Sequence, residues 1–139
     1  MSGSLPLILA LDTAQEDCAA ALLKGTELIG SRVETVGSRH SEIILPMIRD
    51  LLKDSGVEKT DLSLIAFGAG PGSFTGLRVA CGVAQGLAWA LECMTAPVSS
   101  LEAQAEWLRD SERLPAGEVI AVLNDARMHE CYGCLLYTS

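Results

Sequence analysis

The chain has 139 residues, 49% of them apolar, which is enough for one packed domain or for part of a two-domain protein. Its formal net charge is −8 and its ten Lys and Arg residues form no run, so its own surface is not expected to grip nucleic-acid phosphates. The five Cys residues, including the Cys131-x-x-Cys134 pair, match no zinc pattern. We therefore expect a soluble, cytoplasmic protein with reduced thiols and no membrane-spanning segment.

The first part of the sequence predicts a three-stranded antiparallel meander. Apolar runs over 5–11, 18–23 and 28–35 have the composition of strands, and residues 24–27 form a turn between the last two. Residues 1–4 are expected to be a disordered start. After the meander, helices and strands alternate: a helix over 38–54, a strand over 62–67, a helix over 77–91, a strand over 94–98, a helix over 99–109 that a capping box opens, and strands over 119–123 and 129–137.

This element order, β-β-β-α-β-α-β-α, is typical of the ribonuclease-H-like lobe that actin-like (ASKHA) ATPases contain twice. The two strands that follow would begin a second lobe. We therefore predict an α/β fold with a ribonuclease-H-like N-terminal lobe over 5–117 and the first strands of an incomplete second lobe over 118–139.

A glycine-rich stretch, Gly68-Ala-Gly-Pro-Gly-Ser-Phe-Thr-Gly-Leu-Arg78, lies between a predicted strand and a predicted helix. In that arrangement backbone amides at a helix N-terminus face an anion, and Ser73 and Thr75 are natural N-cap residues. The stretch is neither a Walker loop nor a dinucleotide fingerprint. It predicts either a phosphate-facing site or a tight turn that holds a buried helix against the sheet. The residues of the candidate nucleotide site are Asp12, Thr13, Gly70, Gly72, Ser73, Thr75 and Gly76.

Two further polar residues invite a functional interpretation. Asp12 stands at the end of the first predicted strand, where a sheet-based active site would place a catalytic or metal-holding carboxylate. The alternative is that Asp12 and Thr13 bond the local backbone, as turn residues do. His40 stands at the start of a helix, but a lone His is more often a cap or a surface contact, because metal sites need several ligands.

Two predicted helices have broad apolar surfaces. The apolar positions of the first fall on one face that Leu45 and Met47 broaden, so this helix either packs on two sides or meets another protein. The second helix is apolar all round, and its small residues would let another helix approach closely. We predict a homodimer for the isolated chain. The predicted partner interface consists of Ile44, Ile48, Leu51, Leu52, Val79, Val83 and Leu87.

Four motifs occur in a fixed order: Leu9-Ala-Leu-Asp-Thr13, Arg39-His-Ser-Glu42, Gly70-Pro-Gly-Ser-Phe-Thr-Gly-Leu-Arg78 and Asp125-Ala-Arg-Met128. With them the chain resembles, over nearly its whole length, the TsaB (YeaZ) family of bacterial proteins required to make threonylcarbamoyladenosine in tRNA. The resemblance implies an actin-like ATPase fold. It also implies a subunit that pairs with the catalytic protein TsaD through the helices near 41–53 and 73–91, and that the ATPase TsaE joins. No direct tRNA binding is expected.

The resemblance also has consequences for the binding of a metal or a cofactor. TsaD-like proteins carry His-x-x-x-His metal ligands on the helix after the strand that corresponds to 94–98. This sequence has Ser100-Leu-Glu-Ala-Gln104 there, and Ser and Gln are poor transition-metal ligands. The resemblance therefore implies a non-catalytic subunit with no catalytic residues, no metal site and no required cofactor, while binding of ATP or ADP stays open.

The sequence departs from the family pattern in two places. His129 stands where the family has Gly, so a bulky side chain occupies a tight turn and is expected to strain the hairpin. The family also continues for most of another lobe, and residues 134–139 match nothing expected at that place.

Two alternatives to the non-catalytic subunit remain. A nucleotide-binding or weak ATPase protein would use Asp12 and the turn over 70–76 around a phosphate. A peptidase would use Ser73 as nucleophile and His40 as base, although no acid partner or Gly-x-Ser-x-Gly elbow supports it.

Overall fold

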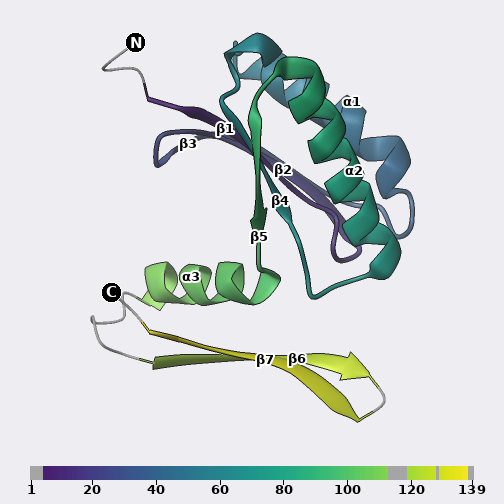
Figure 1. The fold of residues 1–139 in the computed structure, drawn as a ribbon, viewed down its shortest axis with the longest axis vertical. Coiled ribbons are helices and arrows are strands. Elements are labelled where there is room, and N and C mark those ends of the chain that lie inside the picture. The colour runs from purple at the N-terminus through teal and green to yellow at the C-terminus, as the bar shows by residue number, and fades with distance from the viewer. Residues whose placement is uncertain (1–4, 113–118, 128, 138–139) are drawn as a thin grey trace.

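The computed structural model describes residues 5–112, 119–127 and 129–137, so the predicted start at 1–4 lies outside the described residues. Each predicted strand and helix is present, with ends shifted by a few residues. In chain order the elements are β1 (Leu7–Asp12), β2 (Asp17–Lys24), β3 (Glu27–Thr35), α1 (His40–Asp54), the short 3-10 helix η1 (Lys59–Asp61), β4 (Leu64–Gly68), α2 (Phe74–Leu91), β5 (Met94–Val98), α3 (Ser100–Glu112), β6 (Val119–Arg127) and β7 (Glu130–Tyr137) (Figure 1).

The first five strands form one mixed sheet in the order β3-β2-β1-β4-β5. β1 pairs antiparallel with β2, and β2 pairs antiparallel with β3, which confirms the predicted meander. β4 and β5 then extend the sheet in parallel from β1, as strands joined through a helix do. This is the ribonuclease-H-like arrangement that the element order predicted.

Helices α1 and α2 lie next to each other over one face of this sheet (Figure 1). Alternate residues of the strands point toward them, so Leu9, Leu22 and Ile65 are fully buried. The contact of α2 with the sheet is made by small side chains at every fourth position, which bring the helix axis close to the strands. These residues are Gly76, Ala80, Ala84 and Ala88.

The residues of α1 that were predicted to form a partner interface lie in this core. Their face of α1 packs against the sheet, and α1 contacts β2 and β3. The periodicity located the apolar face of α1 correctly, but the chain's own sheet buries this face. Ile44, Ile48, Leu51 and Leu52 are therefore core residues and not interface residues, and Val79, Val83 and Leu87 of α2 are half-buried against the same cluster.

The opposite face of the sheet carries the strand residues that alternate with those buried under the helices. The strand register places Leu28, Val33 and Met94 on this face, beside Leu23, Ala19 and Leu64 respectively. Leu28, Val33 and Met94 are all exposed. α1 and α2 therefore bury only one of the two apolar faces of the sheet.

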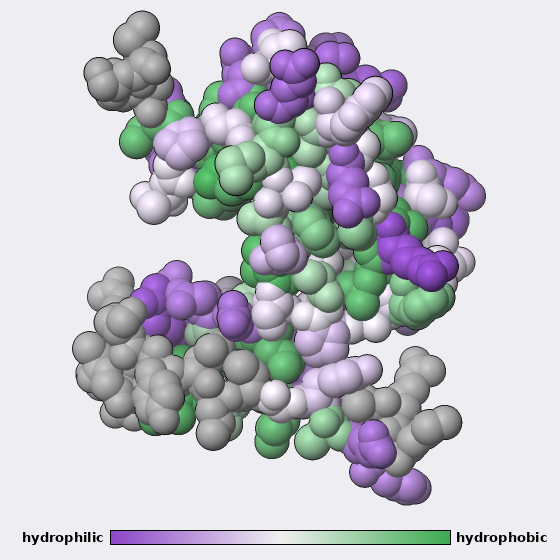
Figure 2. Space-filling model, in the orientation of Figure 1, coloured by the Kyte–Doolittle hydropathy of each residue, from purple (hydrophilic) through white to green (hydrophobic). Residues whose placement is uncertain are grey.

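Helix α3 packs with the β6–β7 hairpin. Leu101 and Ala105 of α3 form a second hydrophobic cluster with Ile120 and Val122 of β6. This packing crosses the boundary predicted after residue 117, and that boundary stays a prediction. In the space-filling view a hollow separates this part from the five-stranded sheet with its two helices (Figure 2).

The β6–β7 hairpin includes both departures noted in the sequence. Residues 134–137 pair with β6 as a regular continuation of β7, although they match no expected motif. His129 has a φ of 62°, the left-handed conformation that glycine adopts without steric cost, as its place in the turn predicted. Over the described residues, no helix combines the length and apolarity needed to cross a bilayer.

Candidate functional site

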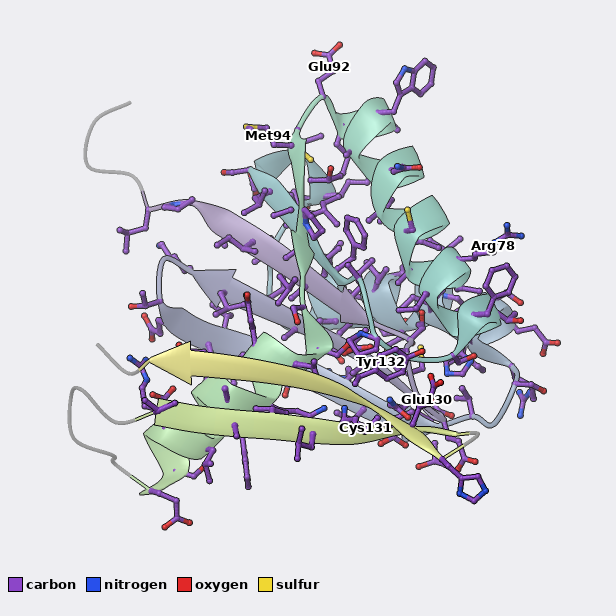
Figure 3. The ribbon with its side chains drawn as sticks, turned by 60° about the horizontal axis from the view of Figure 1, so that its bottom comes forward. Arg78, Glu92, Met94, Glu130, Cys131 and Tyr132 are labelled. Atoms are coloured by element: carbon purple, nitrogen blue, oxygen red, sulfur yellow. The ribbon has the colours of Figure 1, made fainter. Side chains whose placement is uncertain are left out.

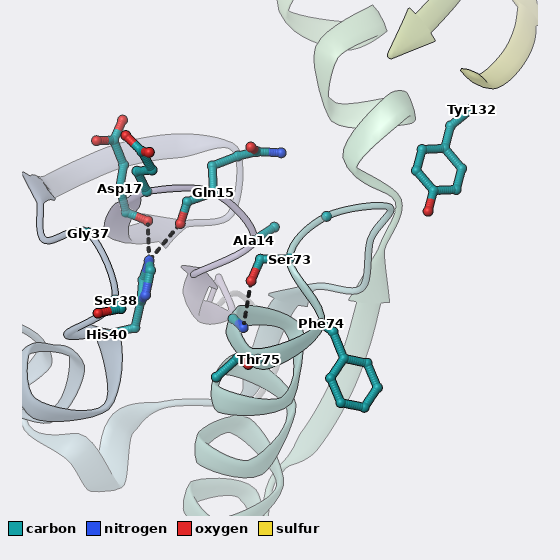
Figure 4. Close-up of a pocket in the computed structure, with 13 residues that line it drawn as sticks. Ala14, Gln15, Asp17, Gly37, Ser38, His40, Ser73, Phe74, Thr75 and Tyr132 are labelled. Atoms are coloured by element: carbon teal, nitrogen blue, oxygen red, sulfur yellow. Dashed lines mark hydrogen bonds between the residues drawn. The ribbon is translucent and has the colours of Figure 1, made fainter. Parts of the chain in front are cut away.

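A cavity of about 940 Å³ opens where the β1–β2 turn, the β3–α1 loop and the start of α2 meet (Figure 4). Four residues predicted for the nucleotide site line it: Gly72, Ser73, Thr75 and Gly76. Tyr132 reaches it from the β6–β7 hairpin. Apart from His40 and Phe74, the rest of the lining could not be found from the sequence, because loops that are distant along the chain supply it. These residues are Ala14, Gln15, Glu16, Asp17, Gly37, Ser38, His40 and Phe74.

Close packing of the protein's own backbone accounts for two glycines of the turn. A Cβ on Gly72 would lie 2.7 Å from the Cβ of Ala14, and a Cβ on Gly76 would overlap the carbonyl oxygen of Thr13. The N–H of Ser73 donates to the carbonyl of Ala14 at 2.7 Å. The hydroxyl of Thr13 donates to the carbonyl of Gly76 at 2.5 Å. The glycine-rich turn is thus fastened to the β1–β2 turn, as the tight-turn interpretation predicts.

The start of α2 is capped from within the chain. The side chain of Ser73 accepts from the N–H of Gly76 at 3.2 Å, which confirms Ser73 as the N-cap. The acidic residues Glu16 and Asp17 line the same cavity, and their negative charge would act against a phosphate there. Binding of ATP or ADP therefore stays a prediction, and the charges around this cavity act against it.

His40 anchors the β1–β2 turn to the start of α1. Its side chain is buried, and its Nε2 lies 2.6 Å from the carbonyl oxygen of Gln15 and 3.2 Å from that of Asp17 (Figure 4). Since carbonyl oxygens only accept, Nε2 carries the proton and donates to them. His40 is therefore a structural contact, the more common role of a lone His.

The peptidase interpretation requires Ser73 and His40 to bond each other. The Ser73 hydroxyl instead accepts from Gly76, and the Nε2 of His40 donates to backbone carbonyls. Within the described part of the chain, no hydrogen bond joins the two side chains. The two side chains share a cavity without forming a nucleophile and base pair.

Asp12 belongs to a different cavity from the glycine-rich turn. Its Oδ1 accepts from the N–H of Ala14 at 2.8 Å, which is the turn role that competed with the catalytic interpretation. Asp12 lines a smaller cavity of about 250 Å³ formed with the first two turns of α3. The two cavities adjoin at Ala14 and Gln15, and the predicted grouping of Asp12 with Gly72 and Ser73 around one phosphate stays a prediction. Gly70 lines neither cavity, and its carbonyl accepts from the N–H of Ser100 at 2.9 Å.

The smaller cavity also contains the positions compared with the metal ligands of TsaD-like proteins. Ser100 and Gln104 both line it, together with Asp12. One carboxylate, one hydroxyl and amide oxygens are a poor donor set for a transition metal. Over residues 5–112, 119–127 and 129–137, no group of three or more His, Cys, Asp or Glu side chains could hold a metal ion.

The outer surface of α2 is the second candidate site. Phe74 is 71% exposed at the start of the helix and Trp89 is 87% exposed near its end. The guanidinium of Arg78 lies 4.3 Å from the centre of the Phe74 ring and projects from the first turns of α2 (Figure 3). Between these aromatic residues, Gly82 and Gly86 are exposed and a Cβ on either would enter open space.

Comparison with known proteins gives the family. A family model described as TsaD, tRNA N6-adenosine threonylcarbamoyltransferase, matches residues 30–138. The tRNA threonylcarbamoyladenosine biosynthesis protein TsaB of Escherichia coli (strain K12) is 44% identical over 128 residues, which cover 90% of this chain and 52% of that protein. The chain belongs to the TsaB (YeaZ) family. TsaB of Haemophilus influenzae is 42% identical over 126 residues, covering 90% of this chain and 51% of that protein.

A solved TsaB (YeaZ) structure agrees with the fold. YeaZ from Pseudomonas aeruginosa superposes with a TM-score of 0.87 at 40% sequence identity, covering 97% of this chain and 62% of that chain. The chain spans about half the length of the curated TsaB relatives that it matches. The sequence identities and the superposition with YeaZ confirm the predicted family and the ribonuclease-H-like fold.

Proposed function

We propose that this protein acts in tRNA threonylcarbamoyladenosine biosynthesis as a non-catalytic subunit. It binds a TsaD-like catalytic subunit, and a TsaE-like ATPase joins the pair. The names of the curated TsaB relatives support the pathway. The use of Gly72, Ser73 and Gly76 in backbone packing supports the non-catalytic role, because these residues hold the turn together.

The outer face of α2 is the surface proposed for the catalytic partner. The single observation that carries this assignment is the exposure of Trp89 and Phe74 at the two ends of one helical face. Isolated exposed apolar residues are common, but two large aromatic residues on one helix expose enough apolar surface to anchor a partner. Gly82 and Gly86 between them leave room for a partner helix to approach the backbone of α2. The same face would pair two copies when the partner is absent.

A reconstituted modification assay tests the non-catalytic role. Purified TsaD-like and TsaE-like proteins, tRNA and the threonylcarbamoyl donor are combined with this protein or with a variant. Ser73→Ala removes the candidate nucleophile and is expected to support modification within about twofold of the unchanged protein. Trp89→Glu is expected to abolish that support, because it places a charge in the proposed contact.

Each result of the assay has a defined meaning. Loss of modification with Ser73→Ala, in protein that retains its circular dichroism spectrum, would show chemistry in this chain and contradict the proposal. Thr26→Glu is the matched control, since it adds the same charge at an exposed turn far from α2. Titration calorimetry with ATP tests the nucleotide-binding alternative separately.

A further inference from the structure

The smaller cavity has features of a binding site that the proposed function does not use. Four residues of α3 line it at the spacing of one helical face, i, i+3, i+4 and i+7. Asp12, Ala14 and Gln15 of the β1–β2 turn form the other side. The four α3 residues are Ser100, Ala103, Gln104 and Trp107.

Four polar side chains line the cavity beside two alanines and a tryptophan, and its single charge is negative. The Oδ1 of Asp12 is already bonded to the N–H of Ala14. Over the described residues, no Lys or Arg forms an ion pair with Asp12. The nearby cation of α3, Arg109, pairs with Glu106 at 2.7 Å and is not part of the lining.

Ser100 is a second and independent indication of a ligand. Its side chain is nine-tenths buried on the cavity wall, and its Oγ has no hydrogen-bond partner within the described part of the chain. An unpartnered buried hydroxyl costs free energy, and a donor bound in the cavity would recover it once the Ser100 side chain turns toward the cavity, because its Oγ is closed to solvent in this rotamer. The first-turn amides of α3 do not supply that partner, because Ser99 accepts from Glu102 and from Ala103 and the N–H of Ser100 donates to Gly70.

Trp107 adds an aromatic face. Its side chain is 68% exposed, so the indole stands at the mouth of the cavity and is not part of the core. A carboxylate beside an exposed indole is the combination that recognises an organic cation, by charge and by cation–π attraction. A planar guanidinium has five N–H donors and stacks on aromatic rings, whereas an ammonium has three donors and no plane.

We propose that this cavity binds the guanidinium of an arginyl side chain from a partner protein. The guanidinium stacks on Trp107 and donates to the free Oδ2 of Asp12. Ser100 and the amide oxygens of Gln15 and Gln104 accept its remaining N–H groups. The volume of about 250 Å³ equals roughly eight waters at 30 Å³ each, enough for one such side chain. The acidic net charge of −8 would favour the approach of a cationic partner.

The test uses N-acetyl-arginine amide as the probe, with the whole chain in a Trp89→Phe background so that Trp107 is the only fluorophore of its kind. We expect saturable quenching with a Kd in the millimolar range. The matching lysine amide should bind several-fold more weakly. The citrulline amide, which has nearly the same shape without the charge, should not saturate.

Variants separate the proposed contacts. Asp12→Asn keeps an oxygen to accept from the N–H of Ala14 and removes the charge, so we expect at least a tenfold loss of affinity with an unchanged melting temperature. Ser100→Ala should weaken binding by a smaller factor. Glu27→Gln, which removes one exposed charge from the start of β3, is the control and should bind as the unchanged protein does. Equal binding of the citrulline amide, or an affinity that Asp12→Asn leaves unchanged, would overturn the proposal.

Discussion

The hydroxyl of Thr13 donates to the carbonyl oxygen of Gly76, and the carbonyl oxygen of Thr13 lies where a side chain on Gly76 would begin. These two residues are 63 positions apart in the sequence, and both are fully or nearly fully buried. Their contact fastens the turn after β1 to the first turn of α2. The glycine-rich stretch therefore holds strand and helix together, and its glycines are required by this approach.

Replacing Gly76 by Ala should destabilise the protein strongly. The added methyl group would overlap the Thr13 carbonyl, and backbone atoms on both sides would have to move. We expect the free energy of unfolding to fall by about 3 kcal/mol or more, measured by urea denaturation. Gly82→Ala is the control, because its new methyl group enters open space in the same helix and should raise stability by about 0.5–1 kcal/mol. Similar losses in both variants would contradict this account of the turn.

The hydroxyl of Thr13 can be tested without changing the size of the side chain. Thr13→Val keeps the shape and removes the donor to Gly76, so we expect a loss of about 1–3 kcal/mol in the free energy of unfolding. Thr13→Ser keeps the hydroxyl and loses one methyl group, so hydrogen exchange at the start of α2 should stay slow in Thr13→Ser and become faster in Thr13→Val. Equal exchange in the two variants would show that this hydrogen bond does not hold the turn.

Cys18 makes the stability of the fold depend on pH in the alkaline range. Burial, with a smaller contribution from the charge of Glu34, raises the pKa of the thiol from 9.0 to about 11. Between those two values the unfolded chain releases the proton and the folded chain keeps it, so stability falls as pH rises from 9 to 11. The loss attributable to Cys18 is about 2–3 kcal/mol. Urea denaturation from pH 8 to 11 should show a shallower decline in Cys18→Ala, and parallel curves for the two proteins would contradict the assignment.

Two residues adopt a left-handed backbone conformation that a glycine would adopt more easily. Glu92 ends α2 with a φ of 55°, at the connection to β5 (Figure 3). His129 has a φ of 62° in the β6–β7 turn. Glu92→Gly should raise the free energy of unfolding by about 0.5–1 kcal/mol, and His129→Gly should act in the same direction. Gln85→Gly, inside the right-handed part of α2, should lower it by about 1 kcal/mol. Thermal melts compare the three, and destabilisation by Glu92→Gly would contradict the argument.

The strands and their order could be predicted from the sequence because alternation and turn residues are local signals. The glycine-rich turn was also located correctly, and the Ser73 cap follows from residue type and position. Which surface each apolar face packs against could not be predicted in the same way. Ile44 and Leu51 look the same in sequence whether they meet the chain's own sheet or another protein, and the sheet satisfies them. The separation of Asp12 from Ser73 into two cavities likewise depends on where α3 packs.

Sedimentation velocity with a TsaD-like catalytic subunit tests the central claim most directly, namely that the outer face of α2 binds the catalytic partner. Three forms of this protein are mixed with the partner: the unchanged chain, Trp89→Glu and the control Thr26→Glu. Because Trp89 is 87% exposed, its replacement should leave the fold intact, which circular dichroism checks. We predict a heterodimer with the unchanged chain and with Thr26→Glu, and separate species with Trp89→Glu. A heterodimer that forms equally well with Trp89→Glu would contradict the assignment of this surface.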